Sequence, residues 1–143
     1  MQKRLLLITQ WFDPEPTFKG ILFAKELNKL GFDVEVVTGF PNYPGGKVYK
    51  GYKIKIFQKE IIDGIKVIRL PLFPSHNKSK LGRVFNYVSF FISTTFYVIF
   101  FAKRPDFVYA YHPPLTVGLS AVLLKLIKKT PVLYDIQDMW PDT

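Results

Sequence analysis

Polar side chains and a flat aromatic ring gather near the end of the sequence, in the stretch YDIQDMWPD (134–142). Asp135 and Gln137 alternate with an apolar residue, and Asp138 follows directly. A carboxylate at the tip of a strand can accept a hydrogen bond from a sugar hydroxyl or take a proton from an attacking one. Trp140 offers an apolar face that suits packing on a sugar ring. The stretch therefore predicts a site for a hydroxyl-rich substrate, unless its carboxylates only order a loop.

A second candidate site is the stretch FDPEPTFKG (12–20), which connects an expected strand to an expected helix. The N-terminus of a helix at this place offers free N–H groups and a positive dipole end to an anion. Gly20 removes a side chain that could block the approach of a phosphate. No GxGxxG follows, so a dinucleotide fingerprint is excluded. The alternative is that Gly20 only permits close helix packing.

The chain has two histidines, and they lie in different expected loops. Neither His76 nor His112 has an acidic or histidine neighbour at metal-ligand spacing, so we expect no metal. His112 comes at the carboxyl end of an expected strand, in YAYHPPL, where it either contacts substrate or supports the Pro-Pro turn. No P-loop, Ser–His–Asp or Cys–His arrangement can be assembled from these residues.

Positive charge is concentrated in one quarter of the chain. The net charge is +9, and residues 47–83 hold ten lysines and arginines against two carboxylates. A local basic surface implies an anionic partner such as phospholipid headgroups, nucleotide phosphates or nucleic acid, although a solvated lysine-rich hairpin is the plain alternative. No RRM or OB signature is present, so we expect no nucleic acid. The residues assigned to the membrane- or anion-facing surface are Lys47, Lys50, Lys53, Lys55 and Arg83.

The apolar pattern predicts an α/β fold with a mainly parallel open sheet, helices on both faces and an inserted basic β-hairpin. Thr17 is the expected N-cap of the first helix, Gly31 ends it, and Asp63-Gly64 forms the hairpin turn. Segment 39–52 is a long loop, rich in glycine and tyrosine, of the kind that is usually functional. The expected elements are strand 5–9, helix 17–30, strand 33–39, hairpin 53–70, strand 106–111, helix 115–129 and strand 131–137.

Segment 84–102 is a run of nineteen uncharged residues between Arg83 and Lys103-Arg104. Roughly 20 apolar residues can span a bilayer, so the segment is just long enough for a membrane-spanning helix. Polar residues interrupt it, and a spanning helix would put two halves of one sheet on opposite sides of the membrane. The pattern therefore favours a helix buried in the core over a helix at the membrane surface, and either of these over a span.

The length and composition are those of one globular domain. With 143 residues, 48% of them hydrophobic and 17% aromatic, the chain can bury a core and is not a disordered tail. It has no cysteine, which fits a reducing compartment. The apolar run near the N-terminus, Leu5–Ile8, is too short for the h-region of a signal peptide.

Four stretches resemble the N-terminal half of family 4 GT-B glycosyltransferases: TQWFDPEPTFKG, TGFPNYPGGKVYKGY, YHPPLTVGL and YDIQDMWPDT. They occur in this order, and GFPNYPGG and DMWPD are the most specific of them. The similarity is greatest to bacterial surface-polysaccharide (O-antigen and capsule) enzymes that act on lipid-linked acceptors. It covers residues 1–143, which would be the N-terminal, Rossmann-like, acceptor-side domain.

The resemblance implies a retaining transferase with no cofactor and no metal. Its partners would be a nucleotide-sugar donor, a polyprenyl-diphosphate-linked saccharide acceptor and the anionic inner face of the cell membrane, where the protein would be cytoplasmic and peripheral. By position, Gly20 would approach the donor diphosphate. Asp138, with Trp140 and Pro141, would match the family's Asp-Leu-Trp-Pro element and carry catalysis, and His112 would face substrate.

The sequence departs from the family at three places. Lys19-Gly20 offers one glycine where many relatives have two, and Gln137 stands where relatives often have His or Arg. The C-terminal domain that binds the donor is absent, so we expect 1–143 to be a fragment, inactive alone and able to dimerise. The rival hypotheses are a self-standing, non-enzymatic module that binds lipid or nucleotide, and a single-span membrane protein.

Overall fold

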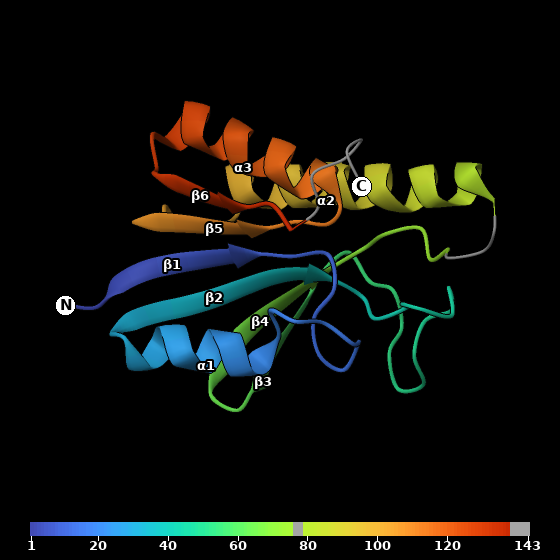
Figure 1. Ribbon diagram of the computed structural model, residues 1–143, viewed down its shortest axis with the longest axis horizontal. Helices are drawn as coiled ribbons and strands as arrows, with labels where there is room; N and C mark the ends of the chain where they lie inside the picture. Colours follow the sequence, from blue (N-terminus) through green and yellow to red (C-terminus); the bar gives the residue numbers. More distant parts are fainter. Residues whose placement is uncertain (76–78, 138–143) are drawn as a thin grey trace.

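Six strands form one sheet in the computed structural model, which describes residues 1–75 and 79–137 (Figure 1). Helix α1 lies on one face of this sheet, and α2 and α3 lie together on the other. In chain order the elements are β1 (Lys3–Ile8), α1 (Ile21–Lys29), β2 (Phe32–Gly39), β3 (Gln58–Ile62), β4 (Ile65–Leu70), α2 (Lys80–Phe100), β5 (Phe107–Tyr111), α3 (Leu115–Lys128) and β6 (Val132–Asp135).

The strand order is β3-β4-β2-β1-β5-β6, and the β3–β4 hairpin is the antiparallel pair at one edge. The other neighbouring strands are parallel, and Leu7 of β1 lies opposite Val36 of β2 and Tyr109 of β5. The predicted Rossmann-like α/β class is confirmed. The chain leaves β1 in one direction along the sheet and reaches β5 on its other side, so the topology switches between these two strands.

Two apolar cores lie on the two faces of the sheet. Successive side chains of a strand point to opposite faces. Leu5 and Leu7 accordingly pack with Ala24 of α1, whereas Leu6 and Ile8 pack with residues of α2 and α3. The central strands are therefore continuous apolar runs, as the sequence predicts for strands that are covered on both faces.

The basic hairpin is shorter than its predicted span 53–70. Asp63 and Gly64 form its turn with φ values of 48° and 82°, which confirms the two-residue turn. Strand β3 begins only at Gln58, which pairs with Arg69, close to the end of β4. Residues before Phe57 lie beyond the end of β4 in this register, where Pro71 follows Leu70 and has no N–H to donate. Lys53 and Lys55 therefore precede the hairpin.

Helix α2 is neither a fully buried core helix nor isolated from the sheet. Asn86, Phe90, Thr94, Tyr97 and Val98 are its buried residues. Strands β4 and β5, before and after it, belong to the same sheet, although by length and composition α2 could cross a membrane. Its other face exposes a continuous apolar stripe, which we call the α2 stripe: Leu81, Val84, Phe85, Val88, Ile92, Phe96 and Phe100.

Candidate functional site

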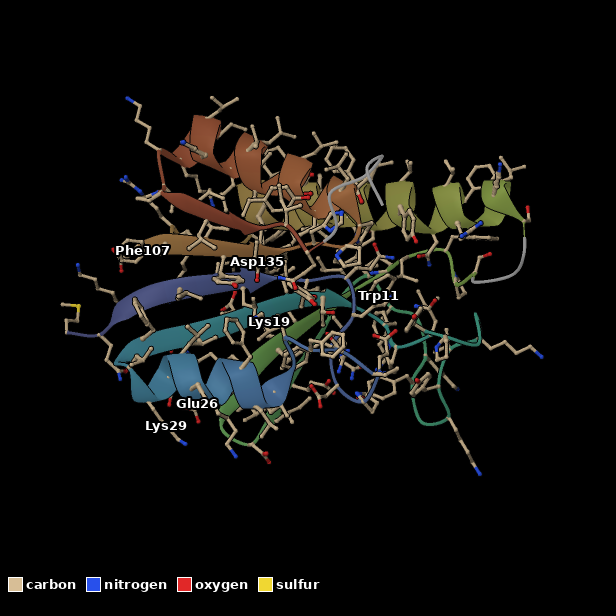
Figure 2. The ribbon with its side chains drawn as sticks, viewed as in Figure 1. Trp11, Lys19, Glu26, Lys29, Phe107 and Asp135 are labelled. Carbon is tan, nitrogen blue, oxygen red and sulfur yellow. The ribbon has the colours of Figure 1, made fainter. Side chains whose placement is uncertain are left out.

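The carboxyl ends of the parallel strands meet at one edge of the sheet, which is where open α/β folds bind ligands. Gln10 and Trp11 follow β1, and His112 follows β5 directly across the topological switch. Asp135 is the last residue of β6. Figure 2 shows Trp11 and Asp135 toward this carboxyl-terminal side of the sheet. The edge therefore gathers polar and aromatic groups from strands that are far apart in sequence.

Asp135 is held by hydrogen bonds from two neighbouring side chains. The Tyr109 hydroxyl donates to Oδ2 at 2.5 Å, and Gln137 Nε2 donates to Oδ1. Burial, and next the Asp135 carboxylate, raise the pKa of Tyr109, so its hydroxyl stays a donor. The structure thus brings Asp135 and Gln137 together, while Asp138 and Trp140 lie outside the described residues.

His112 lies against the same strand end. Its backbone N–H donates to the Asp135 carbonyl at 2.9 Å, and its ring meets the Tyr134 ring edge-on with centroids 6.3 Å apart. Its Nδ1 atom is buried and has no hydrogen-bond partner within the described residues. A buried ring nitrogen without a partner is costly, so this atom is suited to a hydrogen bond with a bound molecule.

Gly20 faces an internal carboxylate. Helix α1 begins at Ile21 and not at Thr17, because Asp13 Oδ2 accepts the Ile21 N–H at 2.6 Å and caps the helix from eight residues upstream. A Cβ on Gly20 would lie 2.2 Å from this Asp13 oxygen. The Asp13 carboxylate thus occupies the position at which the helix N-terminus would attract an anion.

Substituting Gly20→Ala is expected to displace Asp13 and to lower the free energy of unfolding by about 1 kcal/mol, the usual value of an N-cap. Urea denaturation followed by circular dichroism measures it. Gly45→Ala is the matched control, because nothing lies within 4 Å of a Cβ at that position. Equal stability of the two variants would contradict the capping role.

Glu15 lies at the candidate site, and it was not predicted from the sequence. It is buried, and its carboxylate accepts the backbone N–H groups of Phe12 at 3.3 Å, Asn42 at 3.0 Å and Tyr43 at 2.9 Å. Burial raises its pKa to about 7, while these N–H groups and the charge of Arg69 act in the opposite direction. Glu15 therefore ties the loop after β1 to the loop after β2. The signal in the sequence was a lone acidic residue between two prolines.

Arg69 connects β3, the end of β2 and the loop after β1 beneath this edge. Its side chain is fully buried, and its Nε donates to Glu60 Oε1 at 2.8 Å. Nη1 donates to the Gly39 carbonyl at 3.2 Å, and Nη2 donates to the Asp13 carbonyl. The Tyr52 ring lies under the guanidinium, 5.3 Å from its carbon. Arg69 is one of the ten cations of segment 47–83, but it adds nothing to an exposed basic surface, because its charge is paired inside the fold.

An aromatic pair lines the edge beside Glu15. The rings of Trp11 and Tyr43 lie 4.5 Å apart, tilted by 31°. The Tyr49 hydroxyl donates to the Tyr43 carbonyl at 2.5 Å and fixes the loop that carries this ring. Both rings are partly exposed, and they give the edge an apolar surface of the kind that packs on sugar rings.

The basic side chains assigned to a membrane- or anion-facing surface are all exposed, and none of them forms an ion pair within the described residues. Lys47, Lys50, Lys53 and Lys55 lie between β2 and β3, whereas Arg83 lies in the first turn of α2. The described part of the chain holds no group of three His, Asp or Glu side chains that could bind a metal ion.

The chain belongs to the glycosyl transferase 4-like domain family, whose model matches residues 22–143. Membership supports a glycosyltransferase-type function. Among solved structures, the chain is similar to the C-terminal domain of a hydrogenase from Pyrococcus furiosus, with 18% identity, a TM-score of 0.53 and coverage of 93% of this chain and 91% of that one. At that identity the likeness concerns the fold alone. No curated protein matches the sequence.

Proposed function

We propose that this domain forms the acceptor side of a retaining glycosyltransferase. The enzyme transfers a sugar from a nucleotide-sugar to a polyprenyl-diphosphate-linked saccharide during surface-polysaccharide synthesis. The observation that carries the proposal is that His112, Asp135, Gln137 and the Trp11–Tyr43 pair all lie along the carboxyl edge of the sheet. The chain that carries them belongs to the glycosyl transferase 4-like family.

The edge suits an acceptor saccharide chemically. Its hydrogen-bonding groups come from rigid strand ends, and its aromatic pair supplies an apolar face, the combination that sugar binding needs. The Asp13 carboxylate at the start of α1 leaves less room for a diphosphate than Gly20 alone implies. We therefore assign binding of the donor diphosphate mainly to a second Rossmann-like domain, with no metal and no other cofactor.

A peripheral position at the inner face of the cell membrane is part of the proposal. The α2 stripe exposes large apolar side chains along a helix of 21 residues. Exposed lysines precede β3, and they alternate with Ile54 and Ile56 in the sequence KIKI. Apolar side chains can enter the headgroup region while lysines pair with anionic lipid, the usual arrangement of interfacial segments.

The test is transfer of labelled sugar from nucleotide-sugars to a polyprenyl-diphosphate saccharide by the protein with its donor domain. His112→Ala is expected to lower transfer about tenfold, the effect of one lost hydrogen bond. Asp138→Ala is expected to lower it by about 10²–10⁴-fold, as for a lost general base. Both variants should unfold at the temperature of the unmodified protein.

Full activity in the folded Asp138→Ala variant would contradict the catalytic role that the family resemblance implies for Asp138. Lys125→Ala is the matched control, because this exposed lysine lies near the C-terminus of α3, away from the edge. If the unmodified protein transfers no sugar from any donor yet binds lipid or nucleotide, the non-enzymatic module becomes the better description.

A further inference from the structure

A groove lies between α2 and the β3 edge of the sheet, apart from the candidate acceptor site. Its walls are mostly apolar: Ile56, Phe57, Ile92, Phe96 and Phe101, with Ser93 and Tyr97 among the other lining residues. Its volume of about 450 Å³ lies in the range of ligand pockets. It begins beside Leu70 and Pro71, where β4 ends, and part of the α2 stripe forms one wall.

A charged hollow of about 730 Å³ continues this groove, and Lys59, Tyr97 and Phe101 line both. The hollow runs to Arg4 and Lys103, so its far end lies at the amino-terminal side of the sheet, opposite the acceptor edge. An apolar groove that opens into a charged hollow matches the shape of an amphiphile.

The charged side chains in the hollow that lack an ion-pair partner among the described residues are positive. Its carboxylates already have cations, because Glu35 lies 3.8 Å from Arg4 and Glu60 lies 2.8 Å from Arg69. The Tyr97 hydroxyl also donates to Glu35 at 3.3 Å. Lys59 and Lys103 line the hollow, and neither pairs with a carboxylate in the part of the chain that the structure describes.

We propose that this groove binds one hydrocarbon chain of an anionic membrane phospholipid, whose phosphate is held by Lys59 and Lys103. The apolar walls remove the chain from water, and the two ammonium groups meet the phosphate without displacing an existing ion pair. The site would hold the domain on the bilayer in a fixed orientation. It rests on the membrane position proposed above and names the ligand that would fix it, but it does not depend on the transfer reaction.

Binding of single-chain alkyl phosphates tests the proposal, measured by isothermal titration calorimetry below their micelle concentrations. Affinity should rise about fourfold for each methylene added from hexyl to dodecyl phosphate, until the groove is full. Inorganic phosphate and neutral dodecyl maltoside should each bind at least about tenfold more weakly than dodecyl phosphate. Affinity that does not depend on chain length would overturn the proposal.

Two variants separate the apolar groove from the basic hollow. Ile92→Glu places a charge on an exposed groove wall and should abolish the chain-length dependence. Lys59→Glu should abolish the preference for phosphate over maltoside. Leu22→Glu on α1 and Lys125→Glu on α3 are the exposed controls and should change neither property.

The same variants identify other occupants of the groove. If Ile92→Glu converts a dimer to a monomer in sedimentation, the groove is covered by protein and the proposal is wrong. If Ile92→Glu fails to fold, Lys59→Glu still tests whether the phosphate is recognised, and an unchanged preference for phosphate over maltoside would overturn the proposal. His112→Ala should leave alkyl phosphate binding unchanged, and Ile92→Glu should leave transfer to a water-soluble acceptor unchanged, so the failure of one proposal does not imply the failure of the other.

Discussion

Replacing Arg69 with methionine is expected to lower the free energy of unfolding by about 3–5 kcal/mol, the usual result of removing one partner of a buried ion pair. Methionine fills similar space but donates no hydrogen bond. The variant would remove the cation that pairs with the Glu60 carboxylate, which keeps only longer hydrogen bonds from Tyr52 and Gln58. The carbonyl groups of Gly39 and Asp13 would also lose their Arg69 donor. Urea denaturation followed by circular dichroism measures the loss, which is a large share of the stability of a small domain.

Lys66→Met on the same strand is the matched control for Arg69→Met. Lys66 is exposed and lies 3.6 Å from Asp33, so its loss should change stability by about 1 kcal/mol or less. Adding Glu60→Gln to Arg69→Met should recover part of the loss, because it removes the unpaired charge. A cost of Arg69→Met no larger than that of Lys66→Met would show that the network does not support the edge.

The case of Arg69 shows what the sequence could and could not predict. Lys66 and Arg69 are three residues apart in β4, so strand alternation already puts their side chains on opposite faces. Both were counted toward one local basic surface, and that error was avoidable. The partners of Arg69 lie on β3, at the end of β2 and on the loop after β1, and no local pattern could have identified them.

The start of α1 illustrates a limit of local rules. Thr17 fits the composition of an N-cap, but the cap comes from Asp13, which reaches the helix through a loop of two prolines. In contrast, the Asp63-Gly64 turn follows from two residues alone, since both adopt positive φ. The sequence therefore predicted elements that depend on local geometry and missed those completed by distant side chains.

Composition alone could not predict that one face of α2 is exposed either. Nineteen uncharged residues suit a core helix, a surface helix and a span equally well by length. The sheet decides between these three alternatives, because β4 and β5 both belong to it and α2 packs along it with one side. The apolar residues on the side of α2 that faces away from the sheet form the α2 stripe, and some of them line the groove.

Replacing Glu15 with glutamine is expected to change how stability depends on pH. The folded protein holds the pKa of Glu15 at about 7, above its ordinary value of 4.5. Between these values the folded state binds a proton that the unfolded chain has lost, so the free energy of unfolding falls as pH rises. The shift corresponds to about 3 kcal/mol, which is present below about pH 4.5 and lost by about pH 8.

Glutamine does not titrate, so Glu15→Gln should remove this slope between about pH 5 and pH 8. It should also be less stable than the unmodified protein at pH 5. Its NH₂ group would face backbone N–H groups where a carboxyl oxygen accepts them, at a cost of about 1–3 kcal/mol. The two proteins should therefore differ most at pH 5 and converge toward pH 8.

Glu26→Gln, at an exposed pair with Lys29, is the control and should keep the pH dependence of stability. An unchanged slope in Glu15→Gln would mean that Glu15 is ionised throughout, and that the loops after β1 and β2 are joined by a charge rather than by a protonated carboxyl group.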